Sequence, residues 1–254
     1  MAAPKVDQLR TKLTDLTNEY GGRALQGMEG WMLRYSEVAT TPFLDQASFP
    51  WIPTLEAGFD RIRAELDQVL QYRDELPNFQ DISTDQLSIT DDDKWKTYFF
   101  FGYGFKSETN CARCPETTKL LEQVPGLTTA FFSILSPHKK IPPHRGPWRG
   151  VVRYHLALMI PEPADQCGIS VGGEVAHWTE GKSLVFDDGY EHFAWNDTDG
   201  VRVVLFTDVL RPLRGPADWA NKALIKAIAF SPFVRDGKAR HLDWEKRFEA
   251  MRNR

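Results

Sequence analysis

The chain has 254 residues, of which 42% are hydrophobic and 26% charged, a composition typical of a globular protein with one large core. A net charge of −4 argues against a nucleic-acid-binding surface, and no apolar run reaches the length that crosses a bilayer. Three cysteines are too few for a disulfide scaffold, so we expect a reducing, cytoplasmic setting.

The first part of the chain predicts helices. Residues 6–20 (VDQLRTKLTDLTNEY) and 55–72 (LEAGFDRIRAELDQVLQY) both repeat apolar side chains at helical spacing. The proline-rich segment 40–53 between them is expected to be a packed loop, and the acidic segment 81–94 a loop or exposed edge. A short helix is expected over 114–124, where a proline occupies the first turn.

From residue 127 the apolar pattern changes to one typical of strands. Seven short segments rich in β-branched and aromatic residues are separated by Gly, Pro, Asn or Asp. Strands at this spacing are typical of a β-sandwich or jelly roll, and helical spacing returns after residue 212. The predicted strands are 127–135, 151–160, 168–172, 174–178, 182–187, 192–197 and 201–210.

No internal repeat or flexible linker divides the chain, so we expect a single domain over residues 1–254. Within it, residues 1–80 would be a mainly helical N-terminal support and residues 95–212 the β core. Residues 213–254 would form C-terminal helices. The fold class predicted is therefore mainly β with flanking α-helices.

The strand at 151–159 carries polar residues where apolar ones are expected. Alternation places Arg153 and His155 on the same face, and both faces are otherwise mostly apolar. A buried arginine and histidine need partners, because an unpaired buried charge is costly. Two interpretations are open at this point: a structural ion pair with Asp or Glu, or an anionic ligand bound inside the barrel.

Two further histidines and a second arginine complete a candidate site. His144 follows a proline-rich turn (PPHRGP), His192 lies 48 residues further on, and Arg202 follows His192 by ten residues. Two imidazoles with open positions beside them suit Fe(II), and an arginine can bind a carboxylate through two parallel hydrogen bonds. An iron site usually carries an acid two residues after its first histidine, but here that position is Gly146.

Several segments together resemble the aspartyl/asparaginyl β-hydroxylases and the related lipid A acyl-chain hydroxylases. The resemblance covers residues 120–212 and lies in FSIL, PPHRGP, VVRYHLAL, CGISVGGEVAHWTEGKSLVFDDGYEHFAWND and VRVVLFTDVLRP. It implies a double-stranded β-helix, a cupin-like jelly roll. It also implies a dioxygenase that uses Fe(II), 2-oxoglutarate and O2 to hydroxylate an unactivated C–H bond, releasing succinate and CO2.

Matched residue by residue, the resemblance implies that His144 and His192 are the catalytic iron ligands. The peptidyl aspartyl hydroxylases have glycine at the position of Gly146, whereas the lipid A branch has Asp there. The chain therefore resembles the version of the site with two histidines and no acidic ligand.

The resemblance also implies a set of residues around 2-oxoglutarate. Ser133 and Arg202 would hold its distal carboxylate, and Arg153 and His155 would face the metal-proximal carboxylate or an acid group of the substrate. Val151 stands where the peptide-hydroxylating branch has a further arginine. The expected substrate bears a carboxylate, and is a free amino acid, a biosynthetic intermediate or an Asp/Asn residue of a peptide.

Alternatives remain for the function and for some residues. The same barrel suits a non-catalytic binding protein or a zinc hydrolase, and the same iron site suits desaturation or cyclisation. Trp148 either lines the substrate mouth, with Arg153, or packs in an ordinary loop. Cys111 and Cys114 have zinc-like spacing without a second pair, which favours packing at a helix start. His241, in a charged tail, is expected to be solvated.

Overall fold

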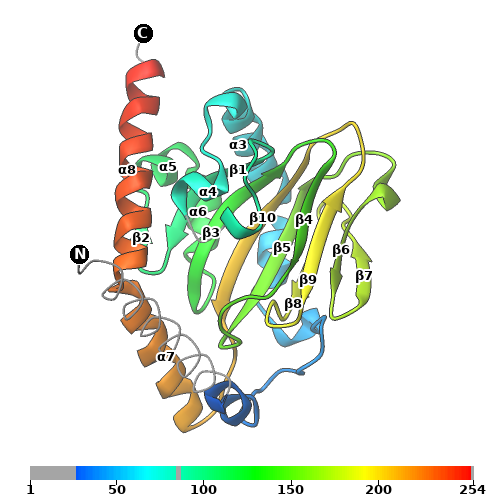
Figure 1. Ribbon diagram of the computed structural model, residues 1–254, viewed down its shortest axis with the longest axis vertical. Helices are drawn as coiled ribbons and strands as arrows, with labels where there is room; N and C mark the ends of the chain where they lie inside the picture. Colours follow the sequence, from blue (N-terminus) through cyan, green and yellow to red (C-terminus); the bar gives the residue numbers. More distant parts are fainter. Residues whose placement is uncertain (1–26, 84–86, 253–254) are drawn as a thin grey trace, which may run out of the picture.

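Two antiparallel sheets packed face to face form the centre of the computed structural model, which describes residues 27–83 and 87–252 (Figure 1). The larger sheet has the strand order β2–β1–β3–β10–β5–β8, and the smaller has β4–β9–β6–β7. The strands are β1 (Trp95–Gly102), β2 (Phe105–Lys106), β3 (Leu127–Leu135), β4 (Lys139–His144), β5 (Val151–Met159), β6 (Cys167–Val171), β7 (Glu174–His177), β8 (Ser183–Phe186), β9 (His192–Asn196) and β10 (Arg202–Leu210).

All seven predicted strands are confirmed, as β3 and β5 to β10. β1, β2 and β4 were not predicted. β4 contains Pro142 and Pro143, which lack the N–H that a central strand needs. The strand tolerates them because it lies at the edge of its sheet, and its pairing with β9 is irregular between Ile141 and His144. The predicted fold class, a mainly β jelly roll of the double-stranded β-helix type with flanking helices, is confirmed.

The alternation predicted along β5 is also confirmed. Val152, Tyr154 and Leu156 join an apolar cluster between the larger sheet and the helices. The opposite face, with Arg153 and His155, is turned toward the smaller sheet, and there Ala157 joins a second apolar cluster. β10 divides in the same way, with Val203 and Leu205 on the helix side. The inward face of both strands thus lies between the two sheets.

Helices cover the outer face of the larger sheet. They are α2 (Ile52–Ala57), α3 (Phe59–Leu70), α5 (Glu108–Arg113) and α6 (Pro115–Leu121), with the short α4 (Phe79–Ile82) and the 3-10 turns η1 (Gln46–Ser48), η2 (Arg73–Glu75) and η4 (Ala164–Gln166) in the connections. The predicted helix over 55–72 is interrupted at Gly58. A Cβ there would lie 2.4 Å from Leu120 Cδ1, so the glycine allows α6 to pack closely. The helix predicted over 6–20 lies outside the described residues.

The predicted C-terminal helices are α7 (Pro216–Ala229) and α8 (Pro232–Arg252), which run along one side of the molecule (Figure 1). α8 adds Trp244 and Phe248 to the helix-side core. The prediction that His241 is solvated was wrong, because its side chain faces inward and is 2% exposed. Within the described ranges, the chain contains no helix with the length and apolar character needed to cross a membrane.

Candidate active site

The two predicted iron ligands lie side by side on neighbouring strands. His144 ends β4, His192 begins β9, and the strand register pairs them directly. Their ring centroids are 4.2 Å apart, with the planes inclined by 51°. Nδ1 of His144 is 2.8 Å from the Pro142 carbonyl oxygen, and Nδ1 of His192 is 3.0 Å from that of Tyr190. Donation from each Nδ1 fixes the tautomer in which Nε2 carries a free lone pair.

The surroundings keep both imidazoles neutral. Burial lowers the pKa of His192 to about 3, helped by the positive charge of Arg153 and by His144. Burial also lowers the pKa of His144. A neutral imidazole is the form that binds a metal. No group of three or more His, Cys, Asp or Glu side chains suited to a metal occurs in the described part of the chain.

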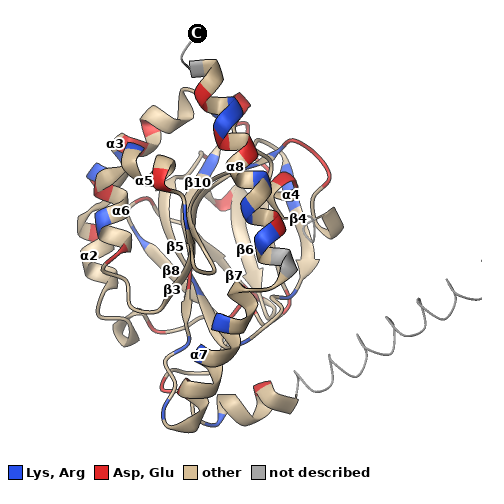
Figure 2. Ribbon diagram, turned by 90° about the vertical axis from the view of Figure 1, so that its left-hand side faces the viewer, with Lys and Arg blue, Asp and Glu red and all other residues tan. Residues whose placement is uncertain are grey.

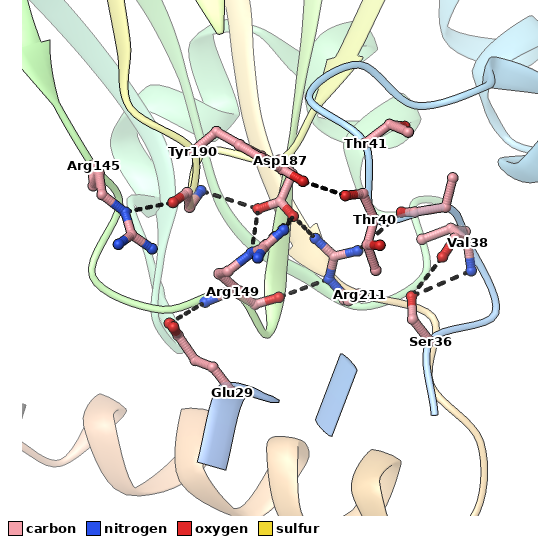
Figure 3. Close-up of polar contacts among 12 residues, drawn as sticks. Glu29, Ser36, Val38, Thr40, Thr41, Arg145, Arg149, Asp187, Tyr190 and Arg211 are labelled. Atoms are coloured by element: carbon pink, nitrogen blue, oxygen red, sulfur yellow. Dashed lines mark hydrogen bonds and ion pairs between the residues drawn. The ribbon is translucent and has the colours of Figure 1, made fainter. Parts of the chain in front are cut away.

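A buried ion-pair network holds the turn that leads to His192 (Figure 3). The Asp187 carboxylate is 2.5 Å from Nη2 of Arg149 and 2.6 Å from Nη2 of Arg211. It also accepts a 3.0 Å hydrogen bond from the backbone N–H of Gly189. This turn contains Tyr190, whose carbonyl orients His192. Arg149 and Arg211 were not singled out from the sequence, because they come from loops distant from this turn along the chain.

Arg202 is a buried cation without an anionic partner. Its side chain is 2% exposed, and no carboxylate forms an ion pair with it among residues 27–83 and 87–252. Its Nη1 donates two long hydrogen bonds to Ser133, at 3.4 Å to Oγ and 3.5 Å to the carbonyl oxygen. Its guanidinium lies 4.7 Å from the Trp178 ring centroid. Burial lowers the pKa of Arg202 to about 10, which still leaves it charged at neutral pH.

Two more buried polar side chains lack partners in the same interior. Neither ring nitrogen of His155 has a hydrogen-bond partner among the described residues, and neither does Nε1 of Trp178. The two rings are stacked, with centroids 6.0 Å apart. Burial and the charges of Arg202 and Arg153 lower the pKa of His155. Because buried polar groups are nearly always hydrogen-bonded, this cluster has the donors and the charge that an anionic ligand would satisfy.

Arg153 differs from Arg202, because it already has partners. Its Nε and Nη2 donate to the two carboxylate oxygens of Asp208, at 2.8 and 3.0 Å. Nη2 is also 2.9 Å from Oδ2 of Asp188. Of the two interpretations offered for this residue, the structural ion pair is the one observed. Its guanidinium lies over the Phe206 ring, 4.2 Å from the centroid, at the wall of a cavity.

This cavity has a volume of about 380 Å³ and reaches His144 and Arg153. Aromatic rings from the larger sheet and the neighbouring segments line part of its wall, and α8 contributes four further lining residues. Arg145 and Lys238 add positive charge to the lining. Trp148 is not among the lining residues; it is 5% exposed and donates a 2.8 Å hydrogen bond to Asn221. The aromatic wall residues are Phe79, Phe99, Tyr103, Phe105, Phe131 and Phe206.

Comparison with known proteins shows the family to which the chain belongs. The sequence profile described as aspartyl/asparaginyl beta-hydroxylase matches residues 56–212. The ornithine lipid ester-linked acyl 2-hydroxylase of Rhizobium tropici is 50% identical over 230 residues, which cover 89% of this chain and 82% of that protein. The jelly-roll fold, together with a family profile that matches more than half of the chain, places the protein in a class of hydroxylases. The chain belongs to the aspartyl/asparaginyl β-hydroxylase family.

Other similar proteins match smaller parts of the chain. The human aspartyl/asparaginyl beta-hydroxylase is 31% identical over 175 residues, and the match covers 64% of this chain but only 23% of that protein. A Pseudomonas putida prolyl-4-hydroxylase structure is 18% identical with a TM-score of 0.39, over 61% of this chain and 88% of that one.

Proposed function

We propose that this chain is an Fe(II)- and 2-oxoglutarate-dependent dioxygenase that hydroxylates an unactivated C–H bond in the acyl chain of a lipid. The observation that carries the proposal is Arg202, a buried guanidinium without a carboxylate partner in the described residues. A buried charge of this kind is costly unless a ligand pairs with it. 2-Oxoglutarate, a dicarboxylate, would supply that pair.

The residues around the proposed iron and 2-oxoglutarate fit them. His144 and His192 would hold the iron through Nε2, since each Nδ1 is engaged by a backbone carbonyl. Arg202 and Ser133 would bind the distal carboxylate of 2-oxoglutarate, while the free nitrogens of His155 and Trp178 complete its surroundings. With O2, the bound iron and 2-oxoglutarate would supply the oxidising power for hydroxylation, with release of succinate and CO2.

The chain's own residues would place the substrate and keep water away. The aromatic rings of the cavity suit an apolar chain directed at His144, and such a chain would displace water from beside the reacting carbon. A free amino acid would leave most of these rings without contact. Arg145 and Lys238 could pair with an acid group of the substrate, in line with the carboxylate-bearing substrate predicted from sequence.

The named activity of the Rhizobium tropici relative also supports an acyl substrate. The chain and this relative share half of their aligned residues, whereas the identity to the human aspartyl/asparaginyl enzyme is 31%. We therefore favour a lipid over the Asp or Asn residue of a peptide.

The test is to incubate the protein with Fe(II), 2-oxoglutarate and an ornithine lipid, and to analyse the lipid by mass spectrometry. We expect one added oxygen in an acyl chain and one succinate per product. The V234W variant, which narrows the cavity, should slow lipid turnover without changing the affinity for 2-oxoglutarate. Turnover of an aspartyl peptide but not of the lipid would contradict the substrate assignment, and product formation without iron would contradict the class.

A further inference from the structure

One face of α7 presents aromatic rings and lysines to solvent. Trp219 is 75% exposed, and Phe230, at the end of the helix, is 73% exposed. At 3.6 residues per turn, positions 219 and 230 fall within about 20° of each other around the helix axis. Lys222 and Lys226, both exposed, lie between them on the same side. The opposite side of the helix is buried through Ala217, Asn221 and Ile225. We call the four exposed residues the α7 face.

This face belongs to a basic part of an acidic chain. Residues 214–240 carry six Lys or Arg and two Asp or Glu, although the net charge of the whole chain is −4. Figure 2 shows basic positions on α7 and along α8. Lys222 pairs with Asp218 at 2.7 Å, whereas Lys226 has no carboxylate partner in the described part of the chain. Exposed aromatic rings beside positive charge are typical of helices that lie on an anionic membrane surface.

The C-terminal end of α7, where Phe230 lies, is close to a segment that lines the proposed substrate cavity, because a Cβ at Gly104 would lie 3.6 Å from Cβ of Ala229. Tyr103 lines that cavity and packs in the same apolar cluster as Ile228, on the inner side of α7. α8 begins directly after α7 and contributes Val234 and Lys238 to the cavity lining. Leu87 is 57% exposed and precedes Ser88, another lining residue. A lipid leaving a bilayer at the α7 face would therefore be close to the cavity.

We propose that the α7 face docks the protein on an anionic lipid bilayer, so that an acyl chain can pass from the bilayer into the cavity. The choice of a bilayer as partner rests on the proposed lipid substrate. Trp219 would lie at the boundary between headgroups and acyl chains, where tryptophan is favoured, and the lysines would contact anionic headgroups. A second copy of the chain fits less well, because a two-fold contact through this face would bring lysines against lysines.

The test is sedimentation of the full-length protein with vesicles of phosphatidylglycerol and phosphatidylcholine, and with vesicles of phosphatidylcholine alone. We expect binding to the anionic vesicles that weakens as salt is raised. The variants W219A/F230A and K222E/K226E should each bind about tenfold or more weakly, because they remove the apolar anchors or reverse the attraction. All four side chains are exposed, so the variants should fold.

Matched controls use exposed residues away from α7. V175A/F193A removes two apolar side chains that are 58% and 38% exposed on the smaller sheet. K140E/K182E makes the same change in net charge as K222E/K226E, at lysines that are both 69% exposed. Both controls should bind like the wild type. The H144A/H192A variant, which lacks the proposed iron ligands, should also bind fully, so failure of the proposed chemistry can be told apart from failure of docking.

Three results would overturn the proposal. The first is no binding of the wild type to anionic vesicles. The second is an equal loss in the α7 variants and in the controls. The third is that W219A/F230A converts a wild-type dimer to a monomer while vesicle binding stays unchanged, which would show that a second copy covers the α7 face.

Discussion

The carboxylate of Asp188 occupies the space that a side chain at Gly146 would need. A Cβ at position 146 would lie 2.1 Å from Asp188 Oδ2, and the backbone N–H of Gly146 donates to the Asp188 carbonyl at 2.7 Å. Asp188 is 1% exposed, and its carboxylate lies beside the Arg153 guanidinium. Packing therefore also explains the glycine at position 146, where an acidic ligand is usual. The buried carboxylate of Asp188, from another loop, fills the space that a side chain at 146 would occupy.

We expect the G146D variant to lose stability without gaining a third iron ligand. The new side chain meets Asp188, and inserting atoms into a packed site costs about 1–3 kcal/mol, before the repulsion between two carboxylates is added. Urea unfolding would measure the stability, and equilibrium titration the Fe(II) affinity. G146A is the matched control, with a smaller loss. A G146D protein as stable as the wild type that binds iron more tightly would contradict this reading.

Replacement of Arg202 by Met should separate ligand binding from stability. Because its charge is buried without an ionic partner in the described residues, R202M should leave the unfolding free energy of the ligand-free protein unchanged or raise it. The affinity for 2-oxoglutarate should fall by about 2–5 kcal/mol, measured by calorimetry. R211M is the control, since Arg211 is equally buried but pairs with Asp187, and it should destabilise the protein. A strongly destabilised R202M protein with normal affinity would refute the assignment.

Asp187 should act as a positioning residue for His192. D187N leaves Arg149 and Arg211 without their shared carboxylate, and breaking a buried pair in this way costs about 3–5 kcal/mol of stability. If Asp187 had only a structural role, the loss of stability would be the only effect of D187N. We expect Fe(II) affinity, measured well below the unfolding transition, to fall as well, because the turn orients His192. D199N, at a fully exposed aspartate, should change neither quantity. If folded D187N binds Fe(II) as tightly as the wild type, Asp187 does not position His192.

Glu245 on α8 should contribute to acid sensitivity. Burial raises the pKa of its carboxyl, but hydrogen bonds from His241 and Ser107 outweigh burial and hold the pKa below 4.5. A carboxylate whose pKa is depressed in the folded state stabilises the protein above its unfolded pKa, and this contribution is lost as pH falls. Unfolding free energy measured against pH should therefore fall below pH 4.5. E245Q should weaken this pH dependence, whereas E174Q, at an exposed position, should leave it unchanged. The same dependence of unfolding free energy on pH in both variants would argue against a role for the hydrogen bonds of Glu245 with His241 and Ser107.

The sequence predicted the inward residues of the barrel but not their partners. Alternation alone placed Arg153 and His155 on one face of β5, as observed. The partner of Arg153 depends on strand register, which sets Asp208 of β10 directly opposite it. Both strands are apolar on their two faces, so no local pattern fixes that register.

Features formed by distant segments were also missed. The aromatic cavity combines side chains of the larger sheet with α4 and α8, and none of these segments indicates a cavity by itself. His241 looked solvated because its neighbours in sequence are charged. In the structure, helical periodicity turns it inward, against Glu245 and the aromatic cluster near Trp244.

The most direct test of the central claim is succinate formation from 2-oxoglutarate under O2, followed with Fe(II) titrated into metal-free protein. The wild type should form succinate only with iron, and lipid substrate should increase the rate. H144A/H192A should neither bind iron nor form succinate while remaining folded. Iron-independent succinate formation, activity with zinc in the absence of O2, or full activity in H144A/H192A would contradict the account.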